Sequence, residues 1–359
     1  MATGRQVVDR SLKVEPLGGA GFTPDGRCFI DMSANIWHDM KSGGERKLFD
    51  KGNFVGGKLA FSADSRLVAR VDRSPLAGLA KGLCIFEVQT ARELGQVEAP
   101  LGFAQPLALS PDGRLVAASG PDAIHVWEVS SGKRLLHQTG KGDLTYWSPE
   151  GFAVCMAFSP DGKTLATGHA NGTILLWDLT GAWKSLSVPD GLMDAVASWD
   201  ALADADCKKA YSAIDRLAAY PAKAVALLRE NVVAAEAVNA QWLADRLAEL
   251  DSDKFVVRAA AQRQLQKVVD RVETPLRQTL EKPPSAEVRN RVEAILKTLQ
   301  NGRSAPIDSE GLRQLRAITV LERIGSHEAQ GLLREWSSGS PDARLTQEAE
   351  AALQRLGSR

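Results

Sequence analysis

The sequence predicts a β + α protein with two domains, a strand-rich domain in residues 1–185 and an all-helical domain in residues 190–359. Two observations predict the first domain: a turn motif recurs four times, and each copy is followed by a strand that ends in an aromatic residue. A third observation predicts the second. Beyond about Leu192 the strong helix formers Ala, Leu, Glu, Arg and Gln dominate, and apolar residues recur at the spacing of one helix face.

The repeated turn has the form Ser-Pro-Asp-Gly. Proline at the second corner and glycine at the fourth favour a type I turn. We expect Asp112 and Asp161 to accept hydrogen bonds within their turns and to be structural. The copies begin 39, 48 and 49 residues apart, about the length of one four-stranded repeat. They are FTPDGR from Phe22, FSADSR from Phe61, LSPDGR from Leu109 and FSPDGK from Phe158.

The strand after each turn ends in an aromatic residue, usually followed by an acid. A polar turn and a further short strand come next, as in SGGERKLFD, QTARELGQV and SSGKRLLHQ. We therefore expect four strands in each of four units. The strand-end pairs are Trp37-His38, Phe86-Glu87, Trp127-Glu128 and Trp177-Asp178.

The last turn can also be interpreted as a loose phosphate-binding loop, because four residues separate Ala157 from Gly162-Lys163-Thr164. Such a loop must lead into a helix whose N-terminus faces the phosphates. Asn171-Gly172, a strong hairpin signal, falls where that helix would run. The stretch therefore predicts strands on both sides of the turn, and a nucleotide-hydrolysing enzyme is disfavoured.

These residues resemble the WD-repeat β-propeller family over about residues 10–185. The resemblance implies that Trp127 and Trp177 lie in the third strand of their sheets and pack between neighbouring sheets. It also implies that Asp122 and Asn171 occupy the tight turn before that strand. A partial propeller of about four blades is the expected architecture.

The chain departs from the family in several ways. No Gly-His pair precedes the first strand of a blade, and His169 lies in a turn, so the family's His-Asp-Ser-Trp network is expected to be incomplete. The first blade has a shortened second hairpin and the second carries the insert VDRSPLAGLAKG. We expect the third and fourth blades to be well formed and the first two to be looser.

The blade number raises a question of closure, because propellers close with four to eight blades and WD-repeat ones usually with about seven. Four blades of this type predict an open arc with two sheet faces and edges uncovered. Three explanations remain: the helical half covers the face, a second chain covers it, or the chain descends from a longer protein.

In the helical half, Ser285 is expected to cap a helix whose apolar face is Val288, Val292, Ile295, Leu296 and Leu299. Two further stripes run through Val257, Ala261, Leu265 and Val268, and through Leu345, Ala349, Ala352, Leu353 and Leu356. We expect eight to ten helices, with breaks at Tyr220-Pro221, Thr274-Pro275 (a cap followed by a first-turn proline), KPPS, NGRSAP, Gly325 and SSGSP.

The stretch LDSDKFVVRAAAQRQL resembles the HEAT-type helical repeat through Asp251, Val257, Arg258, Ala261 and Leu265. The resemblance implies a stacked helical solenoid over about residues 240–356. A compact, non-repeating helical bundle is the alternative. A WD-repeat arc followed by such a tail is also similar to a class of bacterial multidomain proteins, which is the basis for expecting a bacterial protein.

Composition argues against several kinds of partner. The net charge is zero and acidic and basic residues balance in each half, so no excess of positive charge favours nucleic acid. Neither an N-terminal secretory signal nor a run of about eighteen apolar residues is present, and we expect no membrane span and a cytoplasmic location. The acids of DADC and LDSD are expected at helix N-termini.

Titratable residues form no recognisable active site. Cys28, Cys84, Cys155 and Cys207 lack C-x-x-C pairing, and the three in strand patterns are expected to be buried thiols. The histidines (His38, His125, His137, His169 and His327) lack metal-ligand spacing, and His125 is expected to be structural.

We therefore predict no catalytic, cofactor-binding or metal-binding residues, no cofactor and no enzymatic activity. The predicted function is a non-catalytic protein–protein interaction scaffold that uses propeller and helical-repeat surfaces, with self-association through the open edge as one form of partner. The alternatives are an enzyme or lyase-like accessory with residues converging from several repeats, and a degenerate fragment of a longer WD-repeat protein.

Overall fold

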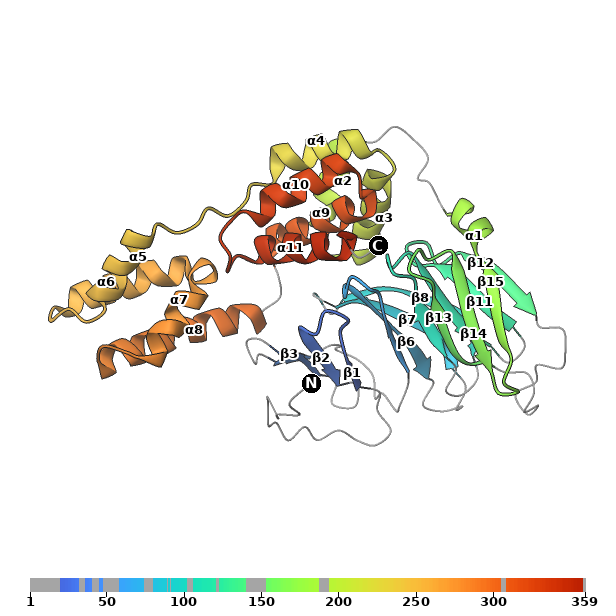
Figure 1. Ribbon diagram of the computed structural model, residues 1–359, viewed down its shortest axis with the longest axis horizontal. Helices are drawn as coiled ribbons and strands as arrows, with labels where there is room; N and C mark the ends of the chain where they lie inside the picture. Colours follow the sequence, from blue (N-terminus) through green and yellow to red (C-terminus); the bar gives the residue numbers. More distant parts are fainter. Residues whose placement is uncertain are drawn as a thin grey trace.

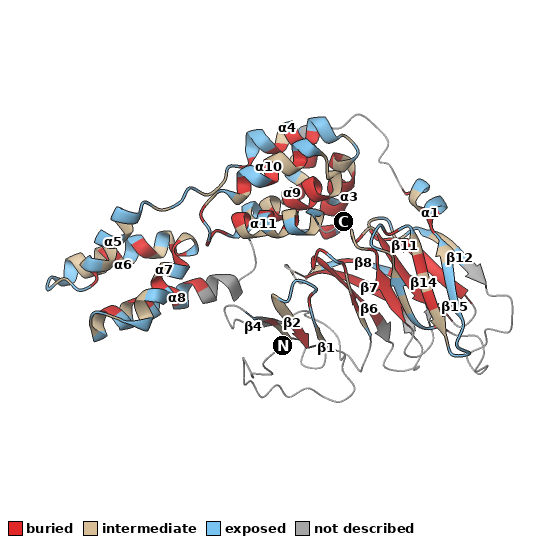
Figure 2. Cartoon of the chain, in the orientation of Figure 1, coloured by how far each residue is buried: buried red, intermediate tan, exposed pale blue. Residues whose placement is uncertain are grey.

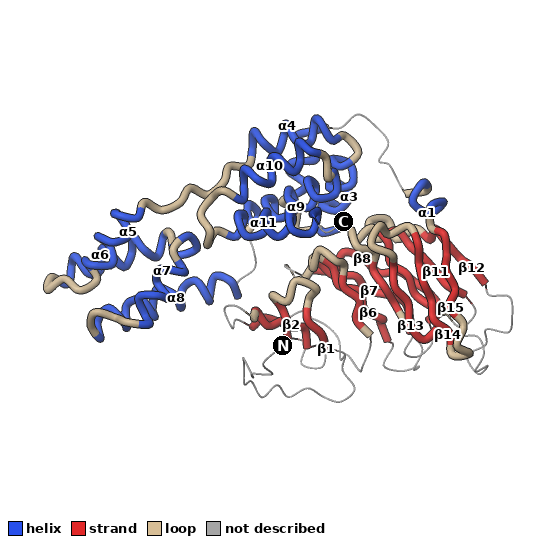
Figure 3. Tube along the Cα trace, in the orientation of Figure 1, coloured by secondary structure: helices blue, strands red, loops and turns tan. Residues whose placement is uncertain are grey.

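The computed structural model describes residues 20–31, 36–40, 45–47, 58–73, 80–88, 90, 92–101, 106–120, 123–139, 153–186, 194–304 and 308–357. Among these residues, every strand and the short helix α1 (Thr180–Lys184) lie within residues 1–185, and the other helices lie within residues 190–359 (Figure 3). The strands form four separate antiparallel sheets in this described part of the chain. The chain is therefore of the β + α class.

Each sheet is a simple meander of consecutive strands, because Gly and Asn at the turns reverse the chain within a few residues. The first is β1 (Ala20–Phe22), β2 (Cys28–Asp31), β3 (Ile36–Asp39) and β4 (Glu45–Lys47). The second is β5 (Leu59–Phe61), β6 (Leu67–Arg73), β7 (Ala80–Glu87) and β8 (Arg92–Leu101). The third is β9 (Leu107–Leu109), β10 (Leu115–Ser119), β11 (Ala123–Glu128) and β12 (Arg134–Thr139). The fourth is β13 (Ala153–Phe158), β14 (Thr164–His169) and β15 (Ile174–Asp178).

The sheets stack face to face in chain order, because alternate residues of a strand point to opposite faces. In β10, Val116 and Ala118 belong to the core that includes the second sheet, whereas Leu115 and Ala117 pack against the fourth sheet. The first and second sheets share their own small core around Ile30. This order agrees with the WD-repeat expectation, and Trp127 and Trp177 pack between sheets from third strands as that resemblance implies.

The four copies of the repeated turn have one atomic design, which the sequence predicted. In the third sheet Ser110 Oγ donates to Asp112 Oδ1 at 2.8 Å, and the same oxygen accepts from the Arg114 amide at 3.1 Å. Asp25, Asp64 and Asp161 make the equivalent pair of bonds. The fourth corner is left-handed in every copy, and in FSADSR that position is Ser65, with φ 59°.

Strand β14 starts at Thr164, so no helix follows Gly162 and the phosphate-loop interpretation is wrong. The Asn171-Gly172 turn is confirmed, because Asn171 Oδ1 accepts from the Thr173 amide and Gly172 has φ 83°. The companion residue Asp122, the shortened hairpin of the first sheet and part of the VDRSPLAGLAKG insert lie outside the described residues.

The observed strand register corrects the strand-end pair that the sequence predicted for the first sheet. Phe86, Trp127 and Trp177 lie opposite the second residue of the preceding strand, and in the first sheet that partner, Phe29, faces His38. His38-Asp39 is therefore the equivalent of Trp127-Glu128, whereas the prediction chose Trp37-His38. The tryptophan one residue earlier points to the other face of the sheet and packs on the Ile30 core.

The helices in the described residues after α1 (Thr180–Lys184) fall into two groups with separate cores (Figure 1). The inner group is α2 (Ala195–Leu202), α3 (Cys207–Ala218), α4 (Pro221–Asn231), α9 (Ser309–Ile324), α10 (His327–Ser337) and α11 (Arg344–Gly357). The outer group is α5 (Ala240–Glu249), α6 (Phe255–Lys267), the 3₁₀ turn η1 (Val269–Arg271), α7 (Glu273–Glu281) and α8 (Ala286–Ser304).

The apolar stripe of α8 is confirmed residue by residue: Val288, Val292, Ile295, Leu296 and Leu299 are all buried. Ser285 caps the helix by accepting from the Val288 amide at 3.2 Å, as predicted. At α7, Thr274 is not the cap. Its amide and hydroxyl donate to the carboxylate of Asp342 at 2.8 and 2.6 Å, which ties the outer helices to the segment before α11.

The acid-rich turns behave differently from one another. Asp206 accepts from the amides of Lys208 and Lys209 and caps α3, as expected for DADC. In LDSD the expectation is wrong for α6, whose N-cap position is Lys254 with no side-chain bond. Asp251 instead accepts from the Ser285 hydroxyl and supports the start of α8.

The inner helices cover one end of the sheets. One continuous core contains residues of the second and third sheets together with α2, α3, α4, α9, α10 and α11 (Figure 2). Helix α3 packs on β8. The outer helices α5–α8 extend away from the sheets (Figure 1).

Candidate interaction surface

The fourth sheet presents an apolar outer face to solvent. The pairing of β13, β14 and β15 puts Ala157, Ala166 and Leu176 side by side on this face, and Cys155, Gly168 and Ile174 form the next row. Ile174 is 72% exposed and Leu176 71% exposed. We call these six residues the outer face. The inner helices leave it uncovered, so the explanation that the helical half covers the last sheet is wrong.

In the third sheet the equivalent face is covered by another sheet. Register makes Ile124 and Val126 of β11 the equivalents of Ile174 and Leu176. Ile124 is 3% exposed and Val126 is fully buried, because the fourth sheet packs on them. The same aliphatic pattern is therefore an interface in one sheet and a solvent-exposed surface in the next.

The fourth sheet has three strands, where the repeat predicted four. After β15, Asp178 Oδ1 accepts from the backbone amide and the hydroxyl of Thr180, and this turn leads the chain into α1. Trp183 of α1 donates to the Gly162 carbonyl at 2.7 Å and lies under the Arg114 guanidinium. The chain is thus drawn away from β15, and no strand pairs with its free edge within the described residues.

His169 is a strand residue and not the turn residue that the sequence predicted. It is the last residue of β14, and its Nε2 lies 2.9 Å from Thr167 Oγ1, which also accepts from Trp177 Nε1 at 2.9 Å. A His-Thr-Trp chain of hydrogen bonds therefore exists in this sheet, although its histidine comes from a different position than in the family. These hydrogen bonds fix the ring of Trp177 against the third sheet.

The first sheet ends the stack at its other end with an aromatic face. Phe22 and Phe29 have ring centroids 5.0 Å apart, and the ring of His38 lies 6.0 Å from that of Phe29. Phe22 is exposed, whereas His38 is buried. His38 on this face is the equivalent of Trp127 and Trp177, which pack onto the preceding sheet in the third and fourth sheets.

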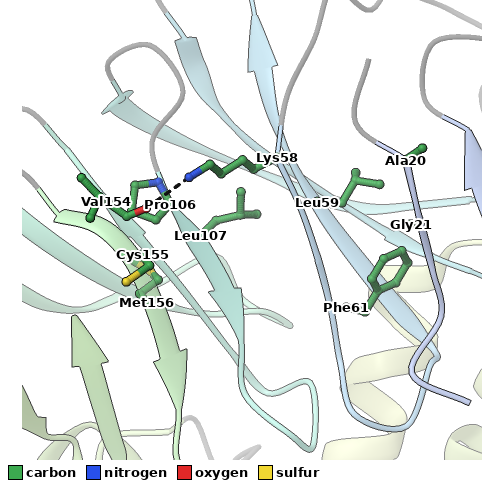
Figure 4. A pocket seen from close by; sticks show the side chains of 10 residues that line it. All are labelled: Ala20, Gly21, Lys58, Leu59, Phe61, Pro106, Leu107, Val154, Cys155 and Met156. Carbon is green, nitrogen blue, oxygen red and sulfur yellow. Dashed lines mark hydrogen bonds between the residues drawn. The ribbon is translucent and has the colours of Figure 1, made fainter. Parts of the chain in front are cut away.

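A cavity of about 460 Å³ lies where the first strands of the four sheets approach one another (Figure 4). Most of the side chains that line it are apolar, but its wall exposes about as much polar as apolar surface. The Lys58 ammonium donates to the Val154 carbonyl at 3.2 Å across one side. Leu59, Phe61, Leu107 and Met156 contribute side chains. Among the described residues that line the cavity, Lys58 is the one charged side chain.

Buried ion pairs join the sheets to the inner helices. Arg316 of α9 donates from Nε and Nη2 to the two carboxylate oxygens of Glu87, both at 3.0 Å, and from Nη1 to the carbonyls of Leu202 and Asp204, both at 2.8 Å. Burial alone lowers the pKa of the Arg316 guanidinium, but Glu87, together with Cys207 and Tyr211, outweighs the burial, and the pKa is raised. The side chain therefore stays charged.

A second cluster repeats this arrangement nearby. Glu322 of α9 accepts from Arg66 of the second sheet at 3.1 Å and from Arg355 of α11 at 2.9 Å through each oxygen. At the first sheet, Arg27 donates to Glu348 at 2.6 Å. We call these contacts and the Arg316–Glu87 pair the ionic seam. Each partner is engaged by another protein group, which is the arrangement that buried charges require.

The cysteines differ from the expectation that strand thiols are buried. Cys84 is buried, but Cys28 is half-buried and Cys155 is exposed, because no further sheet covers the outer face. Cys207 is buried in the seam, where burial, followed by the neighbouring Glu87 carboxylate, raises the pKa of its thiol to about 12. Cys207 is therefore a neutral thiol at pH 7, the opposite of an activated nucleophile.

Two of the five histidines lie side by side, which sequence spacing did not predict. His125 and His137 face each other across β11 and β12 with their Nδ1 atoms 3.2 Å apart, and His125 stacks on Trp127. Among the described residues, no group of three or more His, Cys, Asp or Glu side chains is placed to hold a metal ion. No helix in that part of the chain is both long and apolar enough to cross a membrane.

Comparison with known proteins supports WD-repeat character for the fourth sheet. The WD domain, G-beta repeat family matches residues 145–178, the stretch that contains β13, β14 and β15. No curated protein matches the chain. Among solved structures, the hydrazine synthase of Kuenenia stuttgartiensis is similar at 16% identity and a TM-score of 0.35, over 49% of this chain and 50% of that one. The chain thus spans about half of that protein.

Proposed function

We propose that the chain is a non-catalytic protein-interaction scaffold and that the outer face of the fourth sheet is its principal contact surface. The observation that carries the proposal is the exposure of Ile174 and Leu176, whose equivalents Ile124 and Val126 are buried at a sheet–sheet interface. Large contiguous apolar surfaces on soluble proteins usually mark binding sites. The WD-repeat match over the same strands supports a protein partner.

The buried titratable groups support the non-catalytic part of the proposal. Catalytic sites need groups that reach a substrate and have pKa values near the working pH. Glu87 and Arg316 are instead occupied by each other and by backbone carbonyls, and the pKa of Cys207 is displaced away from neutrality. These groups stabilise the sheet–helix junction.

The proposed architecture is a partial WD-repeat propeller of about four blades in residues 1–185, followed by a HEAT-like helical domain in residues 190–359. Four sheets stacked in chain order support the first part. The packing of α5 on α6 and of α7 on α8 around one core supports helical-repeat character for the outer group. Arg258 of α6 donates to the carbonyls of Ser252 and Asp253, which gives the Val-Arg motif a structural role.

The test is site-specific photo-crosslinking in the source organism. A photoreactive residue at position 176 is expected to capture a protein in a saturable manner, and Ile174→Lys in the same chain is expected to abolish the capture. Val256 of α6, which is 73% exposed, provides the control position for the crosslinker and for Val256→Lys. Equal capture from positions 176 and 256, or capture that Ile174→Lys leaves unchanged, would contradict the proposal.

Self-association is the second candidate, and the aromatic face of the first sheet favours it. A second copy could place Phe22 and Phe29 on the outer face in the way that the fourth sheet packs on the third. Head-to-tail contacts of this kind either close a ring or extend into a filament. Light scattering across a concentration series distinguishes the candidates: a mass that rises with concentration, and that Phe22→Lys returns to one copy, identifies the partner as the chain itself.

A further inference from the structure

The edge of β15 is a second recognition feature, which adjoins the outer face. The Leu179 amide donates to the Lys163 carbonyl, and the His169 amide donates to the Thr173 carbonyl. Because backbone groups alternate along an antiparallel strand, Leu175 and Trp177 also bond to β14. The amides and carbonyls of Ile174, Leu176 and Asp178 therefore point to the opposite side, along the free edge.

The first three sheets show what lies along the equivalent edge of the third strand. In the first three sheets the third strand pairs with a fourth strand: β3 with β4, β7 with β8, and β11 with β12. In the third sheet Leu136 lies opposite Val126, the equivalent of Leu176, and packs on the core shared with the fourth sheet. The third sheet, on which the fourth packs, thus provides the template for the missing strand: antiparallel, with an aliphatic side chain opposite the equivalent of Leu176. The residues at this register are Arg46 in the first sheet and Gly95 in the second.

The path of the chain after β15 leaves this edge accessible. Leu179 and Ala182 are buried in the core shared with the third sheet, and Trp183 bonds to the β13–β14 turn. Helix α1 is therefore held at the end of the sheet and does not run alongside β15 (Figure 1). Exposed strand edges are ready templates for pairing with another chain.

We propose that the β15 edge binds an extended segment of a partner protein, which adds as the fourth, antiparallel strand of this sheet with an aliphatic residue opposite Leu176. Main-chain hydrogen bonds to Ile174, Leu176 and Asp178 supply the affinity, and the aliphatic side chain supplies selectivity, as in other cases of strand addition. The proposal rests on the proposed function, because it states how the partner of the fourth sheet is held.

The experiment selects short random peptides displayed on phage against the full chain and measures amide exchange with and without the selected peptide. Strand addition predicts an aliphatic residue flanked by strand formers in the selected peptides, and slowed exchange of the Leu176 and Asp178 amides. Replacing the Leu176 amide by an ester removes one edge donor without constraining the backbone. We expect this change to weaken binding about tenfold, the effect of one lost hydrogen bond near the upper end of its usual strength.

Leu176→Ala is the matched control, because it keeps the amide and removes only the side chain from the outer face. A peptide that Leu176→Ala weakens but that the ester leaves unchanged overturns strand addition while the outer face remains a binding surface. Leu176 and Asp178 amides that are already protected in the chain alone also overturn it, since the edge is then paired within the chain. Failure to select any peptide has the same consequence. The proposed function itself is tested separately, by the crosslinking at position 176 with its controls at positions 174 and 256.

Discussion

The Arg316–Glu87 pair offers the sharpest test of how the two halves are joined. We predict that Arg316→Met, which keeps most of the aliphatic stem and removes the guanidinium, greatly lowers the free energy of unfolding. The side chain of Arg316 is 2% exposed and that of Glu87 is 7% exposed. Solvent therefore cannot replace the lost partner without opening the junction between α9 and the second sheet.

The magnitude follows from the groups that the change leaves behind. Both oxygens of Glu87 lose a hydrogen bond of 3.0 Å, and the carbonyls of Leu202 and Asp204 lose bonds of 2.8 Å. Removing one member of a buried ion pair typically costs about 3–5 kcal/mol. Thr90 still donates to Glu87, which keeps the expected loss within this range instead of above it.

The assay is urea denaturation followed by tryptophan fluorescence and far-ultraviolet circular dichroism, with a double-mutant cycle. Glu87→Gln and Arg316→Met are each expected to destabilise the chain, and the double variant by less than the sum, since the buried charge that each single variant leaves is then absent. Arg229→Met is the control. Its partner Glu335 is 3.8 Å away and both side chains are more than half exposed, so a loss below about 1 kcal/mol is expected.

Two results would refute the reasoning. A loss below about 1 kcal/mol for Arg316→Met would place this pair among ordinary surface ion pairs. Additive effects of Arg316→Met and Glu87→Gln would mean that the two side chains do not act through each other.

Further predictions concern a glycine and two thiols. Gly162→Ala would put a Cβ 2.8 Å from the Trp183 ring at φ +70°, whereas Gly132→Ala at φ +72° meets no neighbour. Gly132→Ala should cost about 1–2 kcal/mol, and Gly162→Ala about 1–3 kcal/mol more through the clash, measured by urea denaturation. Equal losses for the two variants would show that α1 gives way. Iodoacetamide should label Cys155 in the native chain but Cys207 only on unfolding, as measured by mass spectrometry of peptides. Labelling of Cys207 in the native chain would contradict its burial in the ionic seam. Because the folded-state pKa of Cys207 is raised from 9.0 to about 12, its contribution to stability is complete below pH 9 and is lost as pH rises toward 12. Cys207→Ala should therefore show a shallower alkaline loss of stability, and an unchanged pH profile would count against the shift.

Local sequence was sufficient for the elements and their ends. The Asp-Gly turns, the Asn171-Gly172 hairpin and the Ser285 cap depend on bonds within a few residues, and each was predicted correctly. The apolar stripes of α8 and α11 were predicted for the same reason, because periodicity along one helix specifies its buried face.

The register between strands was harder to predict from the sequence. Trp37 is the aromatic residue that the repeat pattern would select, yet pairing gives that position to His38. A shift of one residue changes the face of a side chain, and in the first sheet both candidates are aromatic. The position of His169 was missed in a similar way, because its bond to Thr167 depends on how far β14 extends before it turns.

The sequence by itself determined which segments are strands and helices, since those choices rest on turn chemistry and on periodicity along the chain. Tertiary structure alone decided which apolar faces are covered. Ile124 and Ile174 have the same residue type and the same local pattern, and only the presence or absence of a neighbouring sheet separates a buried side chain from one that is 72% exposed. The pairing of Glu87 with Arg316 likewise joins residues 229 positions apart, a distance at which no local signal reports contact.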